Sequence, residues 1–234
     1  MLRSFISSAF ALVLATDAFA AGGGMTLLGV GNNQSGVAGP TPTIIATSVS
    51  VFPPNGTAGA INVGAGDTLV VVICGYAFAS AVTASSPNLG SFTNQGFSAG
   101  GGQVFTARNT GGALTGEVVT LSDNSVRAWH VWSIHGVNAL LPVDGSPVFI
   151  DDIGSSQPLN VSLNTTNANR LLLANAISTS STLVFDSSPW SAIPAGQTAY
   201  GEFDQSRPAT TTGAYTAWAG QSGHGSSLIV AIRP

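Results

Sequence analysis

The sequence predicts an all-β protein: an antiparallel, jelly-roll-like β-sandwich with two similar halves, preceded by a short N-terminal apolar helix. Three observations predict this fold. After Gly24 no helical pattern of useful length appears. Instead, about ten short apolar or alternating runs recur, separated by Gly, Pro, Asn and Ser, which favours antiparallel strands because a parallel sheet needs crossover helices. The third observation is a faint internal repeat, and two similar halves are typical of a jelly roll made of two Greek keys.

The first element is the apolar N-terminal segment, residues 1–24. An apolar run over residues 5–15, followed by Ala-Phe-Ala, resembles a secretory signal that is cleaved before Ala21. Asp17 lies close to that site and counts against cleavage. If the segment is not cleaved, it is a retained apolar helix that ends at the glycines 22–24 and anchors the chain to a partner. Both interpretations stay open, and the run is too short to predict a membrane span in the mature protein.

Residues 25–234 are predicted to form one jelly-roll β-sandwich domain. The candidate strands cover residues 25–30, 43–51, 67–76, 102–108, 116–122, 126–137, 157–164, 170–178, 197–204, 214–220 and 226–233. The repeat aligns residues 67–87 with residues 169–189 at a constant offset of 102 residues and without a gap. Each copy contains a buried strand, a loop and a short strand that ends in Ser-Ser-Pro.

The composition excludes several classes of function. Charged residues make up only 7% of the chain, against about 25% in typical soluble domains. The net charge is −4 and the six basic residues form no run, which excludes nucleic-acid binding and argues against anionic membrane surfaces. The single cysteine, Cys74, excludes an intramolecular disulfide and a cysteine-rich metal site. Its place within an apolar strand predicts a buried hydrophobic residue.

The sequence from Gly96 to Gly100 reads GFSAG and matches the G-x-S-x-G motif that surrounds the nucleophilic serine of many hydrolases. That motif requires the serine to lie on a tight turn between a strand and a helix. Here the residues before it are turn-like, and three glycines and a strand-like run follow it. We therefore expect Ser98 to lie in a flexible hairpin loop and not to act as a nucleophile.

The histidines and one acidic pair show no spacing that predicts a metal site. His130 and His135 are an odd number of residues apart, so on one strand they face opposite sides. His224 lies in a Gly-Ser loop without a nearby acid in the sequence. Asp151-Asp152, close to Asp144, is compatible with calcium but lacks the D-x-D-x-D-G pattern, which favours a solvated turn. The sequence predicts no metal and no cofactor.

Glu202 and Asp204 are the one candidate catalytic pair. They lie two residues apart on one face of a predicted strand, at a separation compatible with the carboxyl pair of a glycosidase. Arg207 lies beside them as a ready charge partner, which favours an exposed ion pair. A hydrolase that uses this pair is kept as a third hypothesis, and the sequence predicts that the protein is not an enzyme.

Four aromatic residues, Trp190, Tyr200, Tyr215 and Trp218, cluster in the C-terminal part amid Ser, Thr and Gln. Sugar rings stack on aromatic faces while neutral polar groups bind their hydroxyls, so these four are the candidate glycan-binding residues. The alternative is that they belong to the core, with Trp190 closing one end of the sandwich.

A set of longer motifs extends over residues 41–234, about four-fifths of the chain. These motifs are GAGDTLVVVICGY, VTASSPNLGSFT, VFTARNTGG, VTLSDNSVRAWHVWSIHGV and PVDGS, then NRLLLANAI, STLVFDSSPW, TTTGAYTAW and SSLIVAIRP. Together they resemble the jelly-roll domains of tailed phages, prophages and gene-transfer agents, which occur in head fibres, spikes, decoration proteins and tail-associated proteins. These motifs support a fold and carry no catalytic signature.

The resemblance implies a non-enzymatic structural or adhesive protein on the surface of a phage-like virion. Its implied partners are other virion proteins, further copies of itself, with a trimer favoured, and a glycan of the host cell surface. A secreted bacterial carbohydrate-binding or matrix protein, exported by the N-terminal signal, is the alternative hypothesis.

Overall fold

The computed structural model describes residues 39–50, 60–74, 81–123, 129–178, 183–193 and 202–234. The regular structure of these residues consists of antiparallel strands, β1 to β19, and contains no helix, as the sequence predicted. Within the same ranges no helix that would be long and apolar enough to cross a membrane is found. The predicted N-terminal helix, the candidate strand 25–30 and Tyr200 lie outside the described residues.

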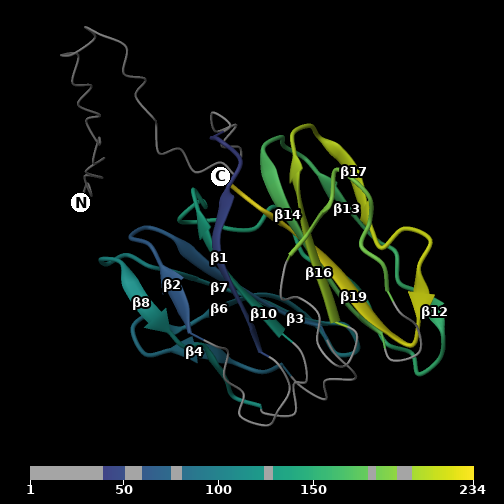
Figure 1. Ribbon diagram of the computed structural model, residues 1–234, viewed down its shortest axis with the longest axis horizontal. Coiled ribbons are helices and arrows are strands. Elements are labelled where there is room, and N and C mark those ends of the chain that lie inside the picture. Colours follow the sequence, from purple (N-terminus) through teal and green to yellow (C-terminus); the bar gives the residue numbers. More distant parts are fainter. Residues whose placement is uncertain (1–38, 51–59, 75–80, 124–128, 179–182, 194–201) are drawn as a thin grey trace, which may run out of the picture. The chain divides into compact units, whose positions relative to one another are not determined.

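The first half of the chain forms a five-stranded antiparallel sheet in the order β1-β10-β3-β7-β6 (Figure 1). Its strands are β1 (Thr43–Ser50), β3 (Thr68–Cys74), β6 (Thr93–Ser98), β7 (Gly102–Arg108) and β10 (Trp129–His135). Short strands cover one face of this sheet: β2 (Ile61–Val63) pairs with β8 (Leu114–Glu117), and β4 (Ala84–Ser86) pairs with both β5 (Gly90–Ser91) and β9 (Thr120–Leu121).

The second half forms another five-stranded antiparallel sheet, in the order β11-β19-β14-β16-β15. Its strands are β11 (Val148–Ile150), β14 (Arg170–Ser178), β15 (Ser191–Ala192), β16 (Glu202–Ala209) and β19 (Gly225–Ile232). Two further ladders accompany it: β12 (Gln157–Pro158) pairs with β18 (Ser222–Gly223), and β13 (Val161–Thr165) pairs with β17 (Gly213–Ala217).

The two large sheets have the same strand order when their strands are compared one by one. β1 corresponds to β11, β10 to β19, β3 to β14, β7 to β16 and β6 to β15. The aligned copies of the sequence repeat contain β3 and β14, which occupy the central position in their respective sheets. Each half therefore has a five-stranded sheet and a second layer of its own.

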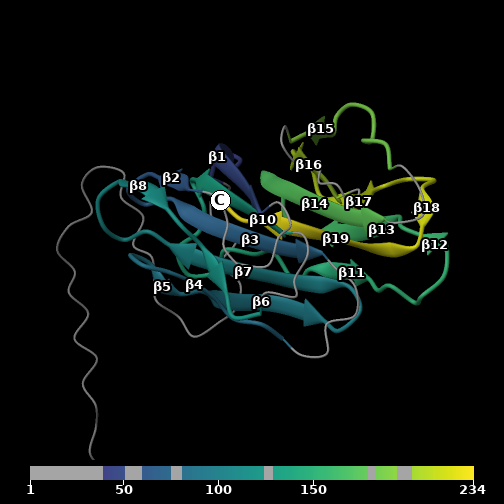
Figure 2. The ribbon, with the colours of Figure 1, turned by 60° about the horizontal axis from the view of Figure 1, so that its bottom comes forward.

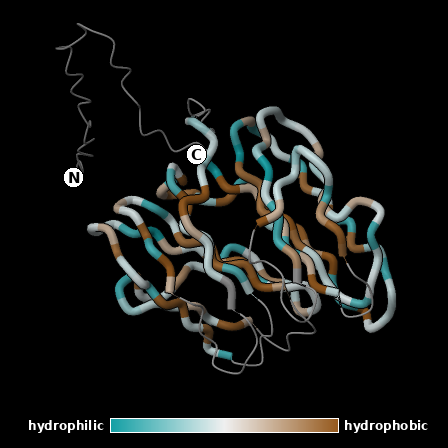
Figure 3. The backbone as a smooth tube through the Cα atoms, in the orientation of Figure 1, coloured by the Kyte–Doolittle hydropathy of each residue, from teal (hydrophilic) through white to brown (hydrophobic). Residues whose placement is uncertain are grey.

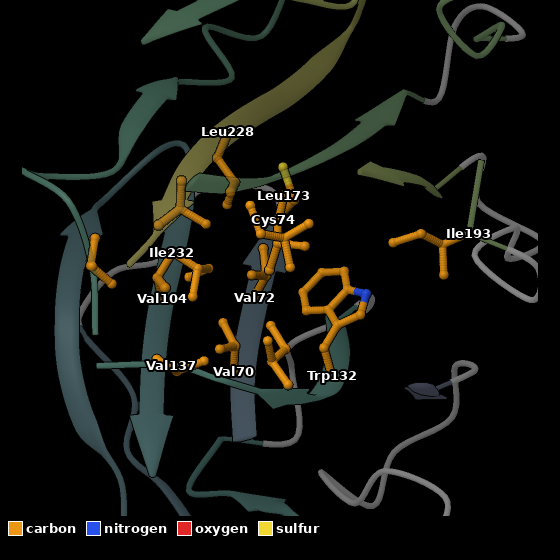
Figure 4. Packing of buried hydrophobic residues seen from close by; sticks show 14 of the residues in the cluster. Val70, Val72, Cys74, Val104, Trp132, Val137, Leu173, Ile193, Leu228 and Ile232 are labelled. Atoms are coloured by element: carbon orange, nitrogen blue, oxygen red, sulfur yellow. The ribbon is translucent and has the colours of Figure 1, made fainter. Parts of the chain in front are cut away.

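Apolar side chains fill three layers, of which the middle one is shared by both halves. The first half has its own core around Leu69 and Trp129, and the second has its own core around Leu172 and Trp218. The shared layer combines Val70, Val72, Cys74 and Trp132 with Leu173, Leu228 and Ile232 (Figure 4). In Figure 2 the green to yellow strands of the second half lie beside the blue to teal strands of the first. The sheets therefore pack face to face, and Cys74 is buried as predicted.

Strands with both faces buried have apolar residues at almost every position. All seven residues of β3 and all nine of β14 are buried. Alternate residues of β3 point into the core of the first half and into the shared layer, which explains the continuous run LVVVIC. Hydrophobic residues accordingly concentrate on these central strands, while hydrophilic residues lie toward the loops (Figure 3).

Several sequence-based strand assignments need correction, among them the predicted strand 157–164, which is split into β12 and β13. The turn-like residues before Ser98 form β6, an edge strand whose side chains are exposed or half-buried, so they show no apolar alternation. The predicted strand 116–122 is split into β8 and β9. The predicted strand 197–204 is described only from Glu202 onward, where β16 continues to Ala209 and passes through Pro208.

Candidate ligand-binding groove

The second half carries a groove of about 660 Å³ next to three of the four predicted glycan-binding aromatics. One wall is the segment Val184–Trp190, which links β14 to β15. The other wall is formed by Thr216, which belongs to β17, and by residues 219–222, which follow that strand. Arg207 of β16 also lines the groove. Residues that are far apart in the sequence therefore meet here.

Side-chain hydrogen bonds hold the two walls together. The Gln221 side chain contacts both main-chain groups of Val184: the Val184 N–H donates to Gln221 Oε1 at 2.7 Å, and Gln221 Nε2 donates to the Val184 carbonyl oxygen. The Asp186 carboxylate accepts the main-chain N–H groups of Trp218, at 2.6 Å, and Ala219, at 3.2 Å. Trp218 adopts a left-handed backbone with φ of 60°, which non-glycine residues rarely do, and the bond to Asp186 stabilises this turn.

Three hydrogen-bond donors occupy the Asp186 carboxylate. Besides the two N–H groups, Asp186 Oδ2 accepts a hydrogen bond from Gln205 Nε2 at 2.6 Å, and the Asp186 N–H donates to Gln205 Oε1 at 3.0 Å. Three donors on one carboxylate indicate a structural role, in which Asp186 joins β16 to both walls of the groove.

The predicted aromatic residues are mostly buried. Trp218 is fully buried in the core of the second half, so its faces do not meet solvent. Trp190 and Tyr215 are 8% and 7% exposed. Trp190 Nε1 donates to the Thr216 carbonyl oxygen at 3.2 Å, and the Tyr215 hydroxyl donates to the Thr211 carbonyl oxygen at 2.7 Å. The alternative interpretation as core residues therefore describes these three side chains, of which Trp190 also lines the groove.

Arg207 lies between two of these aromatic rings. The guanidinium carbon is 4.8 Å from the centre of the Tyr215 ring and 5.7 Å from the centre of the Trp190 ring. Both distances are within the range of cation–π attraction. Arg207 Nε is buried without a hydrogen-bond partner, and no carboxylate lies within ion-pair distance of this side chain among the described residues.

The proposed pairing of Arg207 with Asp204 is wrong. The two residues are three positions apart on β16, so they point to opposite faces of the sheet. Asp204 is fully buried on the face toward the first half, where it contacts His130 Nδ1 of β10 and accepts a hydrogen bond from Asn175 Nδ2 at 2.6 Å. A fully buried carboxylate has no access to a substrate, so Asp204 is not placed to act as one of the two carboxyl groups of a glycosidase site.

The two histidines of β10 face opposite sides, as predicted. His130 reaches the second half, while His135 Nδ1 contacts Asp67 Oδ1 at 2.7 Å within the first half. The predicted Asp144 is buried and joins Arg170 and Arg233 at 2.9 Å and 3.0 Å. No group of three His, Cys, Asp or Glu side chains that could hold a metal ion occurs in the described ranges.

The GFSAG stretch covers the end of β6 and the start of the turn to β7, so Ser98 is the last residue of a strand and does not lie in the predicted loop, and no helix follows it. The Ser98 hydroxyl donates to Asp151 Oδ1 at 2.5 Å, and the Asp152 N–H donates to the Gly100 carbonyl oxygen at 2.8 Å. An added Cβ at Gly100 would lie 2.7 Å from the Asp151 Cβ, so the backbones approach too closely for a side chain. This hairpin therefore contacts the second half, and Ser98 does not lie on the strand-to-helix turn that the hydrolase motif requires.

His224 has an acidic neighbour that its sequence context did not suggest. Its Nε2 lies 3.3 Å from Asp152 Oδ1, which also accepts the Gly154 N–H at 2.9 Å. Asp151 and Asp152 are thus a partnered turn between the two halves and not a purely solvated one. Ser98 contacts Asp151 while His224 contacts Asp152, so the serine and the imidazole do not form a catalytic pair with each other.

Comparisons with known proteins give no relative: no protein family, no curated protein and no solved structure matches this chain. From the sequence Arg207 was considered only as a charge partner of the acidic pair and not as a binding residue, although it lines the groove. The odd spacing from Asp204 was the signal that places the two on opposite faces of a strand.

Proposed function

We propose that this chain is a non-enzymatic structural and adhesive protein of a phage-like particle, built from two tandem jelly rolls. In the first half, strands pair in a nested way: β1 with β10, β2 with β8, and β4 with β9. Nested pairing of early with late strands, split between two layers, is typical of a jelly roll. The second half repeats it with β11 and β19, and β13 and β17.

The observation that carries the proposal is the identical order of the two large sheets. Jelly rolls are common in viral capsid proteins and in lectins, where the sandwich is a scaffold and its loops and edges make contacts. The resemblance of residues 41–234 to phage jelly-roll domains points to the same setting. In this proposal the sheet edges contact other virion proteins and further copies of the chain, in a trimer, and the protein lies on the virion surface.

The glycan contact of this proposal is assigned to the groove of the second half. Apolar and hydroxyl-bearing side chains line it together: Val184 and Pro189 are exposed, as are Ser187 and Ser188. Saccharides combine an apolar ring face with hydroxyl groups and therefore fit such a mixed surface. Trp190 is kept as a glycan contact because it lines the groove, whereas Tyr215 and Trp218 support it from the core.

The decisive experiment is to measure the intact mass and the N-terminal residue of the protein from its natural source, with density-gradient fractions analysed separately. The proposal expects a chain that starts at Met1 and co-sediments with particles. A chain that starts at Ala21 and stays in the soluble fraction would overturn it.

That second outcome would favour the alternative, a secreted carbohydrate-binding or matrix protein. The specific observation behind this alternative is the signal-like segment that ends in Ala-Phe-Ala before Ala21. The groove would serve the same ligand class in both cases, so the location of the protein, and not its binding, decides between them.

A further inference from the structure

We infer that the groove of the second half binds a saccharide that carries a carboxylate, and that Arg207 is the residue that binds this carboxylate. The inference rests on the glycan contact of the proposed function and names its ligand class. It starts from the hydrogen bonds and ion pairs of the arginines, because the chain contains no lysine and its six basic residues are all arginines.

Four arginines lie in the described residues, and three of them have polar partners. Arg170 and Arg233 contact the Asp144 carboxylate, and Arg108 Nη1 donates to the Val137 carbonyl oxygen at 2.8 Å. Arg207 contacts only the Trp190 and Tyr215 rings. It is therefore the arginine of the described part whose hydrogen-bonding capacity is unused.

An unused guanidinium at a half-buried position is unfavourable unless a ligand or solvent satisfies it. Buried polar groups are nearly always hydrogen-bonded, and Arg207 Nε is buried without a partner. The nearest acid that lines the groove, Asp186, does not supply the missing bonds, since it accepts three other donors. The two aromatic rings hold the guanidinium in a fixed place without competing for its N–H groups.

A carboxylate is the group that fits this arrangement. The planar guanidinium donates two parallel N–H bonds to a carboxylate, and such charge-assisted bonds are about twice as strong as neutral ones. The groove volume of about 660 Å³ lies within the usual range for small-molecule sites. The same groove is lined by the hydroxyl-bearing Ser187 and Ser188 and by the apolar Val184 and Pro189, which offer partners for a sugar ring.

The test is a titration of the full chain with galacturonic acid, monitored by saturation-transfer NMR and by tryptophan fluorescence. Three further probes test separately the contributions of the sugar ring, the carboxylate and the negative charge to binding. Galactose has the same ring without the carboxylate, acetate has a carboxylate without the ring, and inorganic phosphate is an anion that the guanidinium also accepts. The variants are R207Q, which removes the charge, and R207K, which keeps the charge but lacks the planar fork. R108Q, in the first half, is the matched control.

The expected result is that galacturonic acid binds more tightly than galactose and acetate by about tenfold, the usual contribution of a hydrogen bond to a charged group. R207Q should abolish this preference, R207K should weaken it, and R108Q should leave it unchanged. Near-UV circular dichroism shows whether each variant keeps its aromatic packing, and R207K serves as the test if R207Q does not fold.

Three outcomes would overturn the inference: equal binding of galacturonic acid and galactose, a preference that survives in R207Q, or phosphate that binds as tightly as the acidic sugar. Absence of any binding would overturn it as well. None of these outcomes affects co-sedimentation with particles, so the inference and the proposed function can fail separately.

Discussion

His130 and His135 lie on the same strand, β10, but are in opposite environments. His130 and its partner Asp204 are both fully buried and come from different halves of the chain. The His135 side chain is 67% exposed and pairs with Asp67 within the first half. The two pairs should contribute very differently to stability. Both side chains of the His130–Asp204 pair are removed from water, whereas the His135 imidazole keeps most of its hydration.

We therefore predict that His130→Ala destabilises the protein far more than His135→Ala. Removing one partner of a buried pair costs about 3–5 kcal/mol, because it leaves the buried Asp204 carboxylate without its partner. The His135 imidazole is mostly exposed, and the buried Asp67 still accepts the Gly64 N–H when the imidazole is removed, so His135→Ala should cost only about 0–1 kcal/mol. Urea unfolding of both variants measures the difference. Equal destabilisation would mean that the contact between His130 and Asp204 does not link the halves.

A second residue-scale prediction concerns Glu117 of β8. Burial acts to raise the pKa of its carboxyl group, but hydrogen bonds from the Asn88 side chain and main chain, at 2.7 Å and 2.9 Å, outweigh burial. The pKa therefore lies below the ordinary value of 4.5. A group with a lowered pKa in the folded state stabilises the protein above its unfolded pKa, and this stabilisation is lost as the pH falls through the folded pKa.

We predict that Glu117→Gln destabilises the protein at neutral pH, by about 1–2 kcal/mol, and that the difference from the wild type disappears on acidification below pH 4.5. Urea unfolding at several pH values measures this. Asp151→Asn is the comparison variant for general effects of lost charge, because an amide oxygen can still accept the hydrogen bond that Ser98 donates to this exposed residue. A difference that stays constant with pH would contradict the assigned hydrogen bonds.

At the scale of elements, the predictability of each strand followed its burial. The bounds of β7 and β14 coincide with those expected from sequence, because both strands are buried along nearly their whole length and read as apolar runs. The edge strand β6 was missed because its side chains face solvent and show no periodicity. Short strands such as β5 consist of two exposed residues, which leave no pattern to detect.

The groove was less predictable than the strands, because it depends on contacts between distant segments. The aromatic cluster correctly drew attention to the region around Trp190, yet sequence alone does not say which rings face inward. Side chains alternate between the two faces of β16, so Arg207 and Asp204 face opposite sides. The predicted strand ended at residue 204 and did not include Arg207, so this alternation was not applied to the two residues. The unsatisfied guanidinium became apparent only from the three-dimensional contacts.

Glycines at the starts of two strands lead to an element-scale prediction. Gly102 begins β7 opposite the end of β3, and Gly225 begins β19 opposite the end of β14. A Cβ at either position would lie well inside contact distance of a main-chain carbonyl oxygen, of Ile73 or Ile177. Because a backbone atom cannot move aside as a flexible side chain does, Gly225→Ala should destabilise by more than about 2 kcal/mol or prevent folding.

The matched control is Gly112→Ala, since a Cβ at Gly112 meets nothing within 4 Å. Its effect should stay within about 0.5 kcal/mol in either direction. Thermal unfolding of the two variants under the same conditions makes the comparison. If Gly225→Ala were as stable as Gly112→Ala, the close approach of β19 to β14 at this end would be wrong.

For the molecule as a whole, the layer between the two large sheets determines how it unfolds. Residues 36–234 form one compact unit, in which Val72, Trp132, Leu173 and Leu228 pack together from both halves. Either half alone would expose this apolar face to water. The two halves therefore repeat the same strand order but should not be independent in stability.

We predict that both halves unfold in a single transition. Trp129 is buried in the core of the first half and Trp218 in that of the second, so variants in which one of them is the sole tryptophan, with the other three replaced by Phe, report on each half separately. Their fluorescence transitions in urea should coincide with the loss of far-UV circular dichroism. Leu173→Ala, in the shared layer, should shift both transitions by an amount that corresponds to about 2–5 kcal/mol. A shift seen by Trp218 but not by Trp129 would mean that the halves unfold independently and that the shared layer contributes little to the fold.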